Sequence, residues 1–288
     1  MIDSRLARKL IEAQFPQWSH LEIREVGYGG WDNRSFRVGD EFVARFPAAE
    51  AYAAQVEKEQ RWLPTLAREL SLSIPAPVAE GRPGPGFPWK WSIYRWIDGA
   101  ALSSAQDVDY PTVARDLGRF LTAFHRVDAT AGPRPGAHNF GRGGDLRVYE
   151  GEVSRALALL QGRVDDRAAL AVWKRAVATE WHATPVWVHG DISPGNLLTR
   201  NGQLAAVIDF GNLAVGDPAC DLAIAWTWFD DHAGEIFKEA AGLDEETWLR
   251  GRGWALWKAL IVAAGIAPTN AIEFSNPMAV IARCLEDK

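Results

Sequence analysis

Residues 186–191 read VWVHGD, residues 194–198 read PGNLL and residues 207–211 read VIDFG. Short apolar runs come directly before His189 and Asp209, and they predict two short strands that end at polar residues. We therefore expect Asp191, Asn196 and Asp209 to lie at strand ends and on a loop that face one cleft. A single aspartate beside a glycine is mostly a turn former, but three polar residues in this order and spacing indicate a functional site.

These three residues are of the types that phosphoryl transfer requires. One carboxylate orients the acceptor hydroxyl and takes its proton, and one or two oxygen ligands hold Mg²⁺ on the phosphates. Aspartate and asparagine supply hard oxygen ligands that suit this ion. The stretch therefore predicts a site for moving a phosphoryl group.

The stretch resembles the catalytic loop of protein kinases, H-R-D-x-x-x-x-N followed by D-F-G, with Gly190 in place of the arginine. The form HGDxxPGN, followed by Gly216-Asp217-Pro218 and Asp221-Leu222, is similar to the aminoglycoside phosphotransferase family, which includes macrolide kinases. The resemblance extends over essentially the whole chain. It implies an α+β, bilobal protein-kinase-like fold, with a small antiparallel β-sheet lobe that carries a helix and a larger, mainly α-helical C-terminal lobe.

The resemblance also implies roles for individual residues. Asp191 corresponds to the catalytic base, which also contacts the substrate. Asn196 and Asp209 correspond to the Mg²⁺ ligands, and His189 supports the loop by hydrogen bonding. The implied co-substrate is ATP or GTP.

The hydrophobic periodicity changes near residue 98. Strand-like runs at 21–28 and 34–46 surround a glycine-rich turn, and another strand covers 89–97. A helix is expected over 50–70, with Pro64 kinking or ending it because proline removes a backbone donor. Helical patterns follow at 113–124, 146–161, 165–182, 217–232 and 244–264. We expect a nucleotide-binding lobe at 1–94, a hinge at 95–98 and a catalytic and substrate-binding lobe at 99–288.

A kinase-like site needs a cation on a strand, fixed by an acid on the next helix, to hold the nucleotide phosphates. Residues 42–47 read FVARFP, so the cation is Arg45 rather than the usual lysine. Glu59 falls within the apolar stripe of the next helix, whereas Glu57 points away. A carboxylate on a buried face needs a partner, and Arg45 is a suitable one. The alternative is a structural ion pair without nucleotide contact.

The sequence gives weaker evidence for the other expected nucleotide contacts. The turn with Gly27, Gly29 and Gly30 would cover the phosphates with backbone N–H groups, and Asn33 and Ser35 would add polar contacts. By resemblance, the backbone of the linker residues Arg95 and Ile97 pairs with the edge of the purine base. Leu198 and Ile208, which flank the catalytic loop, would form an apolar floor under that base. Alternatively, these two residues belong to the hydrophobic core.

The charge is distributed unevenly. Residues 1–188 carry 24 Lys+Arg against 23 Asp+Glu, and residues 189–288 carry 7 against 14. This acidic third argues against a nucleic-acid partner, which needs a basic footprint, and favours a cationic partner or a metal; a solvated acidic face is the alternative. We expect Asp217 and Asp221 to brace the catalytic loop or cap the following helix. The family resemblance suggests that a cationic antibiotic binds to Asp230, Asp231 and Glu235, whose alternative role is a solvated helix end.

The remaining features concern the cellular compartment and the places of the tryptophans and histidines. Two cysteines without metal-ligand spacing exclude a disulfide framework and favour a reduced cytoplasm, and no apolar run reaches membrane-spanning length. Of the 14 tryptophans, most are expected in the core, with one or two in an acceptor pocket, and Trp31 over the cleft. The histidines without ligand pairing are expected at the surface or as caps: His125, His138, His182 and His232.

The sequence therefore predicts an ATP- or GTP-dependent O-kinase, active as a monomer or weak dimer, that acts on a small and possibly cationic molecule. By resemblance, the acceptor is an antibiotic, an aminoglycoside or a macrolide. One alternative is a metabolic kinase of an amino alcohol, amino acid or sugar. The other is a kinase-like binding protein without transfer, suggested by the departure at Arg45.

Overall fold

A five-stranded antiparallel sheet forms the N-terminal part of the chain, in a computed structural model that describes residues 2–27, 32–267 and 276–286. Its strand order is β1-β2-β3-β5-β4. The strands are β1 (Ile23–Glu25), β2 (Asn33–Val38), β3 (Phe42–Pro47), β4 (Pro77–Gly81) and β5 (Trp91–Arg95). The expected single run at 34–46 is instead the hairpin β2–β3. Its turn contains Gly39 at a φ of 56°, a conformation that suits glycine.

The sheet has an aromatic core. Phe36, Phe46 and Trp91 are fully buried, and the rings of Phe46 and Trp91 stack with centroids 4.5 Å apart. Helix α1 (Ser4–Gln14) buries Leu10 and Ile11 in the same cluster. This packing holds β3, and therefore Arg45, in a rigid frame.

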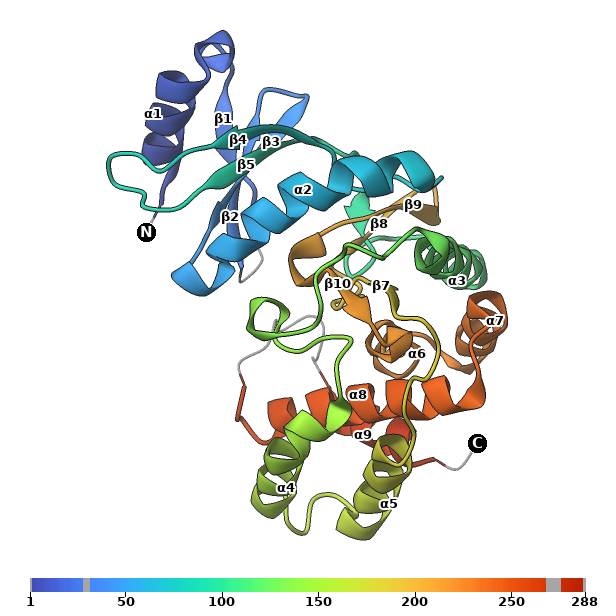
Figure 1. The fold of residues 1–288 in the computed structure, drawn as a ribbon. Helices are drawn as coiled ribbons and strands as arrows, with labels where there is room; N and C mark the ends of the chain where they lie inside the picture. The colour runs from blue at the N-terminus through green and yellow to red at the C-terminus, as the bar shows by residue number, and fades with distance from the viewer. Residues whose placement is uncertain (1, 28–31, 268–275, 287–288) are drawn as a thin grey trace.

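Helix α2 (Ala53–Glu69) lies between the sheet and the helical part of the chain (Figure 1). The prediction that Pro64 might end the helix is wrong, because the helix continues through it to Glu69. Leu63 and Leu66 pack into the core of the helical part. Glu59 is buried on the same helix and Glu57 is exposed, as the stripe predicts.

The C-terminal part is mainly helical and contains two hydrophobic clusters. Its helices are α3 (Tyr110–Arg126), α4 (Glu150–Leu159), α5 (Asp166–Val177), α6 (Ile224–Thr227), α7 (Asp231–Ala241), α8 (Glu245–Ala263) and α9 (Pro277–Leu285). The expected helix at 217–232 is wrong. Asp217 caps a 3₁₀ helix at Pro218–Leu222, the four-residue α6 follows, and Asp230 caps a new helix, α7. Asp217 thus starts the first of these three pieces, and Asp230 separates the last one from the others.

Two small antiparallel sheets carry the predicted catalytic stretch. One pairs β7 (Val186–Val188) with β10 (Ala214–Gly216). The other has the order β6-β8-β9, with β6 (Ala100–Ala101), β8 (Leu197–Arg200) and β9 (Gln203–Val207). The strands expected before His189 and Asp209 are β7 and β9. The mixed α+β architecture predicted from the sequence is confirmed.

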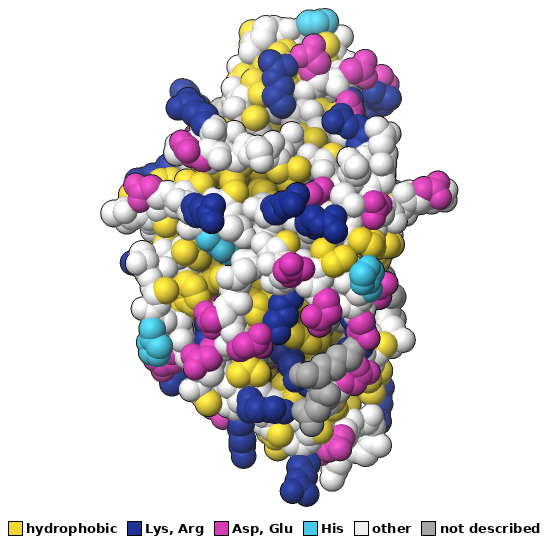
Figure 2. Space-filling view, turned by 90° about the vertical axis from the view of Figure 1, so that its right-hand side faces the viewer, with side chains coloured by type: hydrophobic (Ala, Val, Ile, Leu, Met, Phe, Trp, Pro, Cys, Tyr) yellow, Lys and Arg dark blue, Asp and Glu magenta, His cyan; other side chains and the backbone are white. Residues whose placement is uncertain are grey.

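Several smaller expectations can also be compared with the structure. Cys220 and Cys284 are buried free thiols. Within the described ranges, no helix is both long and apolar enough to span a membrane. Figure 2 shows acidic and basic side chains interspersed on one face of the molecule. His125 is not an ordinary surface residue, because its Nε2 is buried and has no hydrogen-bond partner in the described part of the chain.

Candidate active site

His189, at the end of β7, organises the loop that follows it. Its ring is fully buried, and Nε2 lies 3.0 Å from the carbonyl oxygen of Ile208. The backbone N–H of Asp191 donates to Nδ1 over 3.2 Å. Because Nδ1 accepts, the hydrogen-bond network assigns the ring proton to Nε2. His189 therefore ties the Asp191 loop to the strand that leads to Asp209, as expected.

Asp221 stabilises the same loop by accepting hydrogen bonds from its backbone. Its two carboxylate oxygens accept hydrogen bonds from the backbone N–H groups of His189 and Gly190, each over 2.7 Å. Burial raises the pKa of Asp221, and the two backbone donors oppose that rise. Gly190 has a φ of 81°, and a Cβ there would lie 2.8 Å from the carbonyl oxygen of Asn212. Both constraints explain why glycine replaces the arginine of the protein-kinase loop.

Asp191 and Asn196 are in direct contact. The Nδ2 of Asn196 donates to the backbone carbonyl of Asp191 over 2.9 Å and to its Oδ2 over 3.0 Å. The carbonyl oxygen of Asn196 accepts from the N–H of Ile208 over 2.8 Å, which places Asn196 beside the residue preceding Asp209. Asp209 itself has a φ of 68°, a left-handed conformation that is uncommon for a non-glycine residue. Such backbone strain is typical of functional sites.

Arg45 reaches this group from β3. Its Nη2 lies 2.7 Å from the Oδ1 of Asp209, and its Nη1 lies 3.5 Å from the Oε1 of Glu59. The hydroxyl of Tyr94 donates to the other carboxylate oxygen of Glu59. The predicted Arg45–Glu59 ion pair is present, but the contact with Asp209 is shorter and was not expected. Arg45 thus joins the sheet to the catalytic stretch.

The ionisation of these groups follows from their surroundings. Burial alone would lower the pKa of Arg45, but Asp209 and Glu59 raise it overall. Burial raises the pKa of Glu59 despite the opposing charge of Arg45. Burial would also raise the pKa of Asp209, but the charge of Arg45 and its hydrogen bond more than offset this effect and lower it. The network therefore favours a permanently charged Arg45 beside an ionised Asp209.

The donor set fits a magnesium ion that is shared with a nucleotide. Asp209 supplies a carboxylate, and the Oδ1 of Asn196 makes no hydrogen bond within the described residues. The described part of the chain holds no cluster of three or more His, Cys, Asp or Glu side chains that would bind a metal alone. Magnesium is usually held by one or two carboxylates together with substrate phosphates, so this small set matches that mode.

Asp32 is a site residue that sequence reasoning missed. Gln55 donates to its Oδ2 over 3.1 Å. Burial and the nearby charge of Asp209 raise the pKa of Asp32 to about 6, and Asp191 adds to the rise. A carboxylate beside a glycine-rich turn looks like a turn former, so the sequence alone offers no signal that it faces two other carboxylates.

The predicted nucleotide contacts have mixed outcomes. Gly29, Gly30 and Trp31 lie outside the described residues, whereas Gly27 has open space around its Cα. Asn33 is buried at the start of β2. The backbone N–H of Arg95 donates to the carbonyl of Ala76 over 3.0 Å, so this N–H is already paired. Within the described chain, the N–H of Ile97 has no such partner and stays a prediction for the base.

The predicted floor residues are less buried than their chain neighbours. Leu197 and Val207 are fully buried in the main cluster. Leu198 on β8 and Ile208, which follows β9, are only half-buried and lie outside it. Side chains alternate along a strand, so Leu198 points away from Leu197. The contact of Leu198 and Ile208 with a nucleotide base stays a prediction.

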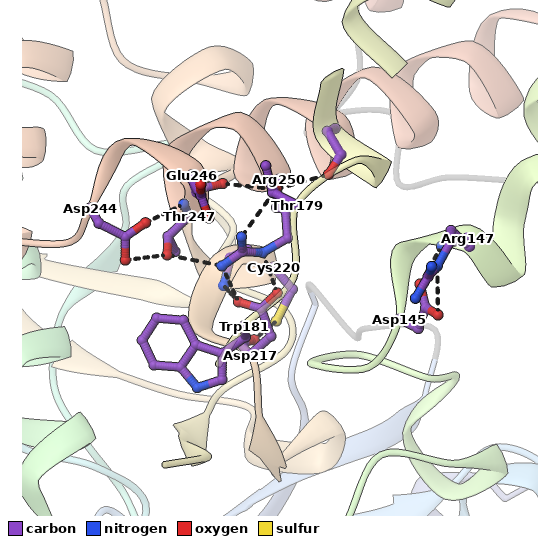
Figure 3. A network of polar contacts seen from close by, with 12 residues as sticks. Asp145, Arg147, Thr179, Trp181, Asp217, Cys220, Asp244, Glu246, Thr247 and Arg250 are labelled. Carbon is purple, nitrogen blue, oxygen red and sulfur yellow. Dashed lines mark hydrogen bonds and ion pairs between the residues drawn. The ribbon is translucent and has the colours of Figure 1, made fainter. Parts of the chain in front are cut away.

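A second polar network joins Asp217 to helix α8 (Figure 3). Arg250 of α8 is buried, and its Nε lies 2.6 Å from the Oδ2 of Asp217. Arg250 also donates to the hydroxyls of Thr179 and Thr247 over 3.1 and 3.0 Å. Burial raises the pKa of Asp217, and Arg250 opposes the rise. Asp217 therefore caps the 3₁₀ helix, one of its two expected roles, and pairs with α8; that it braces the catalytic loop stays a prediction.

A pocket beside Asp191 contains residues that the sequence did not reveal. Its lining comes from four distant segments: Arg142, Gly190, Asp191, Ile192, Cys220, Ala223, Thr227, Trp254, Trp257 and Lys258. No local motif connects these segments, which explains the omission. The predicted acidic residues lie elsewhere: Asp230 caps α7, and Asp230 and Asp231 line a different hollow with His232 and Arg283. Glu235 is exposed on α7.

Comparisons with known proteins place the chain by family and by fold. The sequence model of the phosphotransferase enzyme family matches residues 22–254. No curated protein matches the chain by sequence. Among solved structures, a GDP and kanamycin complex of APH(2")-IIia is 19% identical with a TM-score of 0.74, covering 96% of this chain and 97% of that one.

Macrolide-modifying enzymes are similar as well. The macrolide 2'-phosphotransferase MphH from Brachybacterium faecium is 21% identical with a TM-score of 0.63, covering 95% of this chain and 98% of that one. A macrolide 2'-phosphotransferase type I is 19% identical with a TM-score of 0.64, covering 97% and 98%. At this identity the likeness establishes the fold, and the predicted kinase-like α+β architecture is confirmed.

Proposed function

The chain belongs to the phosphotransferase enzyme family, and from this premise we propose a small-molecule O-kinase that transfers the γ-phosphate of ATP or GTP to a hydroxyl of an antibiotic. The observation that carries the proposal is that three separate segments bring together Asp191 with Asn196, Asp209 and Arg45. Aminoglycosides and macrolides are the acceptor classes that the similar structures name. Residues 1–94 would hold the nucleotide and residues 99–288 the acceptor, with 95–98 as the hinge.

In this proposal, Asp191 is the residue that contacts the acceptor hydroxyl. Its carboxylate accepts a hydrogen bond from the acceptor hydroxyl and takes its proton as the hydroxyl oxygen bonds to the γ-phosphorus. The bond from phosphorus to the β–γ bridging oxygen breaks, and ADP or GDP leaves. The hydrogen bond from Asn196 fixes the carboxylate in place, which is the positioning that this chemistry depends on.

Arg45 and Asp209 act on the phosphate side. A magnesium ion, held by Asp209 and Asn196, would neutralise the developing charge on the phosphates. Arg45 offers a forked, permanently charged donor set to phosphate oxygens while Glu59 holds it. Arg45 pairs with Asp209 through one nitrogen, so its other guanidinium nitrogen atoms would make the contacts to phosphate.

Two other functions compete with this one. A metabolic kinase would use the same residues on an amino alcohol, an amino acid or a sugar. A binding protein without transfer would keep the fold and lose turnover, and the arginine at position 45 is the feature that suggests it. Two observations favour a kinase: Asn196 bonds to Asp191, and the same residue accepts from the N–H of Ile208, next to Asp209.

The test is phosphate transfer by Asp191 variants. Wild-type protein with Mg²⁺ and either nucleotide should add one phosphate to at least one member of a panel of antibiotics and metabolic alcohols, measured by mass spectrometry. Asp191→Asn and Asp191→Ala should lower turnover by roughly 10² to 10⁴ and leave nucleotide affinity within about twofold. Unchanged turnover in both variants would refute the assignment, and products only from metabolic alcohols would select the metabolic kinase.

A further inference from the structure

Gln55 is a buried polar residue of α2, one helical turn before Glu59. Only 3% of the residue is exposed. Its Nε2 donates to the Oδ2 of Asp32 over 3.1 Å, and the backbone carbonyl of Asp32 accepts from the N–H of Ala48 over 2.8 Å. Gln55 therefore ties α2 to the residue that precedes β2, and this contact holds its amide in one place.

The same amide packs against Gly211, two residues after Asp209 in the chain. A Cβ added to Gly211 would lie 2.7 Å from both the Cδ and the Oε1 of Gln55, which is closer than Cβ atoms approach other atoms in proteins. In the described part of the chain this Oε1 has no hydrogen-bond partner, so the glutamine acts on Gly211 by packing. The backbone of Gly211 is not left-handed. Glycine is therefore required at this position because Gln55 fills the space beside it.

Gly211 belongs to the 3₁₀ turn Phe210–Asn212, which begins directly after Asp209. The backbone N–H of Gly211 hydrogen-bonds to the carboxylate of Asp209. From the helical part of the chain, the fully buried Asn139 donates to the last carbonyl of the turn over 3.2 Å. Asp209 has a φ of 68°, and a strained conformation of this kind persists only where the surrounding structure holds it. Gln55 supplies that support from the side of α2.

We propose that Gln55 is a positioning residue for Asp209, the expected magnesium ligand. By filling the space beside Gly211, it holds the strained turn in the conformation that presents the Asp209 carboxylate. Gln55 itself contacts neither nucleotide nor metal. The inference rests on the proposed kinase function, because Mg²⁺ depends on the position of Asp209 only in a protein that binds nucleotide with it. Replacing a group that orients a metal ligand typically lowers metal affinity by roughly 10- to 100-fold.

The test moves volume between positions 55 and 211. Gln55→Ala empties the space beside Gly211, and Gly211→Ala pushes the amide away from Asp32. Each variant should raise the Mg²⁺ concentration for half-maximal nucleotide binding by about tenfold. The double variant Gln55→Ala/Gly211→Ala places a methyl group in the emptied space and should recover about threefold or more of that loss. Fluorescence titration of ATP and GTP analogues on the full chain measures this concentration without requiring transfer.

Gln55→Met separates packing from hydrogen bonding. Methionine fills a similar volume but cannot donate to Asp32, so the Mg²⁺ concentration should stay within about threefold of the wild-type value. A loss in Gln55→Met as large as that in Gln55→Ala, an unchanged value in either alanine variant, or additive losses in the double variant overturns the proposal. If Gln55→Ala does not fold, Gly211→Ala and Gln55→Met still carry the comparison, and equal losses in these two overturn it.

Gln60→Ala is the matched control on the same helix. Gln60 donates to the carbonyl of Ala79 and the hydroxyl oxygen of Ser92 over 3.0 and 2.9 Å, so it joins α2 to the sheet. Its replacement should lower the melting temperature, as Gln55→Ala does, and leave the Mg²⁺ concentration unchanged; an equal rise would overturn the specific role of Gln55. Wild-type protein that binds neither nucleotide with Mg²⁺ refutes the kinase function. Nucleotide binding by the wild type, with the same Mg²⁺ requirement in the Gln55 variants, refutes the positioning role alone.

Discussion

At the scale of single residues, the site depends on groups whose burial is matched by specific partners. Asp221 is buried because two backbone N–H groups satisfy its carboxylate. Arg45 and Glu59 are buried as a pair, with Tyr94 completing the carboxylate. His189 is buried with both ring nitrogens engaged. His125 differs from all of these, because its Nε2 is buried without a partner.

His125 should make the protein sensitive to acid. Burial lowers its pKa to about 4 from 6.5, so the folded chain holds the ring neutral and the unfolded chain binds the proton first. The free energy of unfolding should therefore fall as the pH drops from about 6.5 to 4, by at most about 3 kcal/mol at 1.36 kcal/mol per pKa unit, and by less where water reaches the half-buried ring. Denaturant unfolding across this range, compared between wild type and His125→Gln, measures the difference.

The control for His125 is an exposed histidine. His20→Gln should keep the full pH dependence of the wild type, since His20 lies at the surface. If His125→Gln and wild type lose stability in parallel between pH 6.5 and 4, the acid sensitivity belongs to other groups.

At the scale of elements, the contact between α3 and α7 is unusually close. Gly118 of α3 faces the end of α7, where an added Cβ would lie 2.6 Å from the Cβ of Ala240 and 2.8 Å from the backbone nitrogen of Ala241. The hydroxyl of Thr122 also donates toward the carbonyls of Ala240 and Ala241 over 3.1 and 3.2 Å. Two helices far apart in the sequence therefore meet backbone to backbone.

Two glycine-to-alanine substitutions should have opposite signs. Gly118→Ala must push α3 and α7 apart, because the clash is with backbone, and should lower the free energy of unfolding by about 1–3 kcal/mol. Gly151→Ala in α4 has open space around the new methyl and should raise it by up to about 1 kcal/mol, since alanine favours helix. Urea unfolding of both variants measures the two changes, and a stabilised Gly118→Ala would contradict the close packing.

The helices and strands also show how much of the fold could be predicted from the sequence. Local periodicity and strand-end polar residues predicted β7, β9, α8 and the loop that carries Asp191 and Asn196. The same periodicity misjudged 217–232, because capping by Asp217 and Asp230 outweighs a continuous apolar pattern. Pro64 misled for a related reason: a proline removes one hydrogen bond, and packing of Leu63 and Leu66 keeps the helix together.

The pocket beside Asp191 could not be predicted from the sequence for a different physical reason. Arg142, Trp254 and Asp191 come from segments that are far apart, and only tertiary packing brings them together. The acidic residues of α7 carried the stronger local signal, yet the fold turns them toward another hollow. A catalytic motif is local because a loop builds it, whereas a specificity pocket is assembled by the whole fold.

At the scale of the whole molecule, Arg45 of the sheet forms an ion pair with the catalytic stretch, and nucleotide binding tests its role. A ligand that binds only the folded chain raises the free energy of unfolding by about 2.7 kcal/mol at one hundred times its Kd. If Arg45 contacts phosphate, Arg45→Ala should lower the melting temperature and also remove most of the further rise that nucleotide with Mg²⁺ produces, whereas Arg45→Lys should keep part of that rise. If Arg45 forms only a structural ion pair, Arg45→Ala should lower the melting temperature without nucleotide and leave the rise on nucleotide binding unchanged.

Arg24→Ala is the control, because it removes only exposed ion pairs on β1; it should change neither the melting temperature nor its rise with nucleotide. Differential scanning calorimetry with and without nucleotide separates the two outcomes, and an undiminished rise in Arg45→Ala would mean that the arginine supports the fold without holding the phosphates.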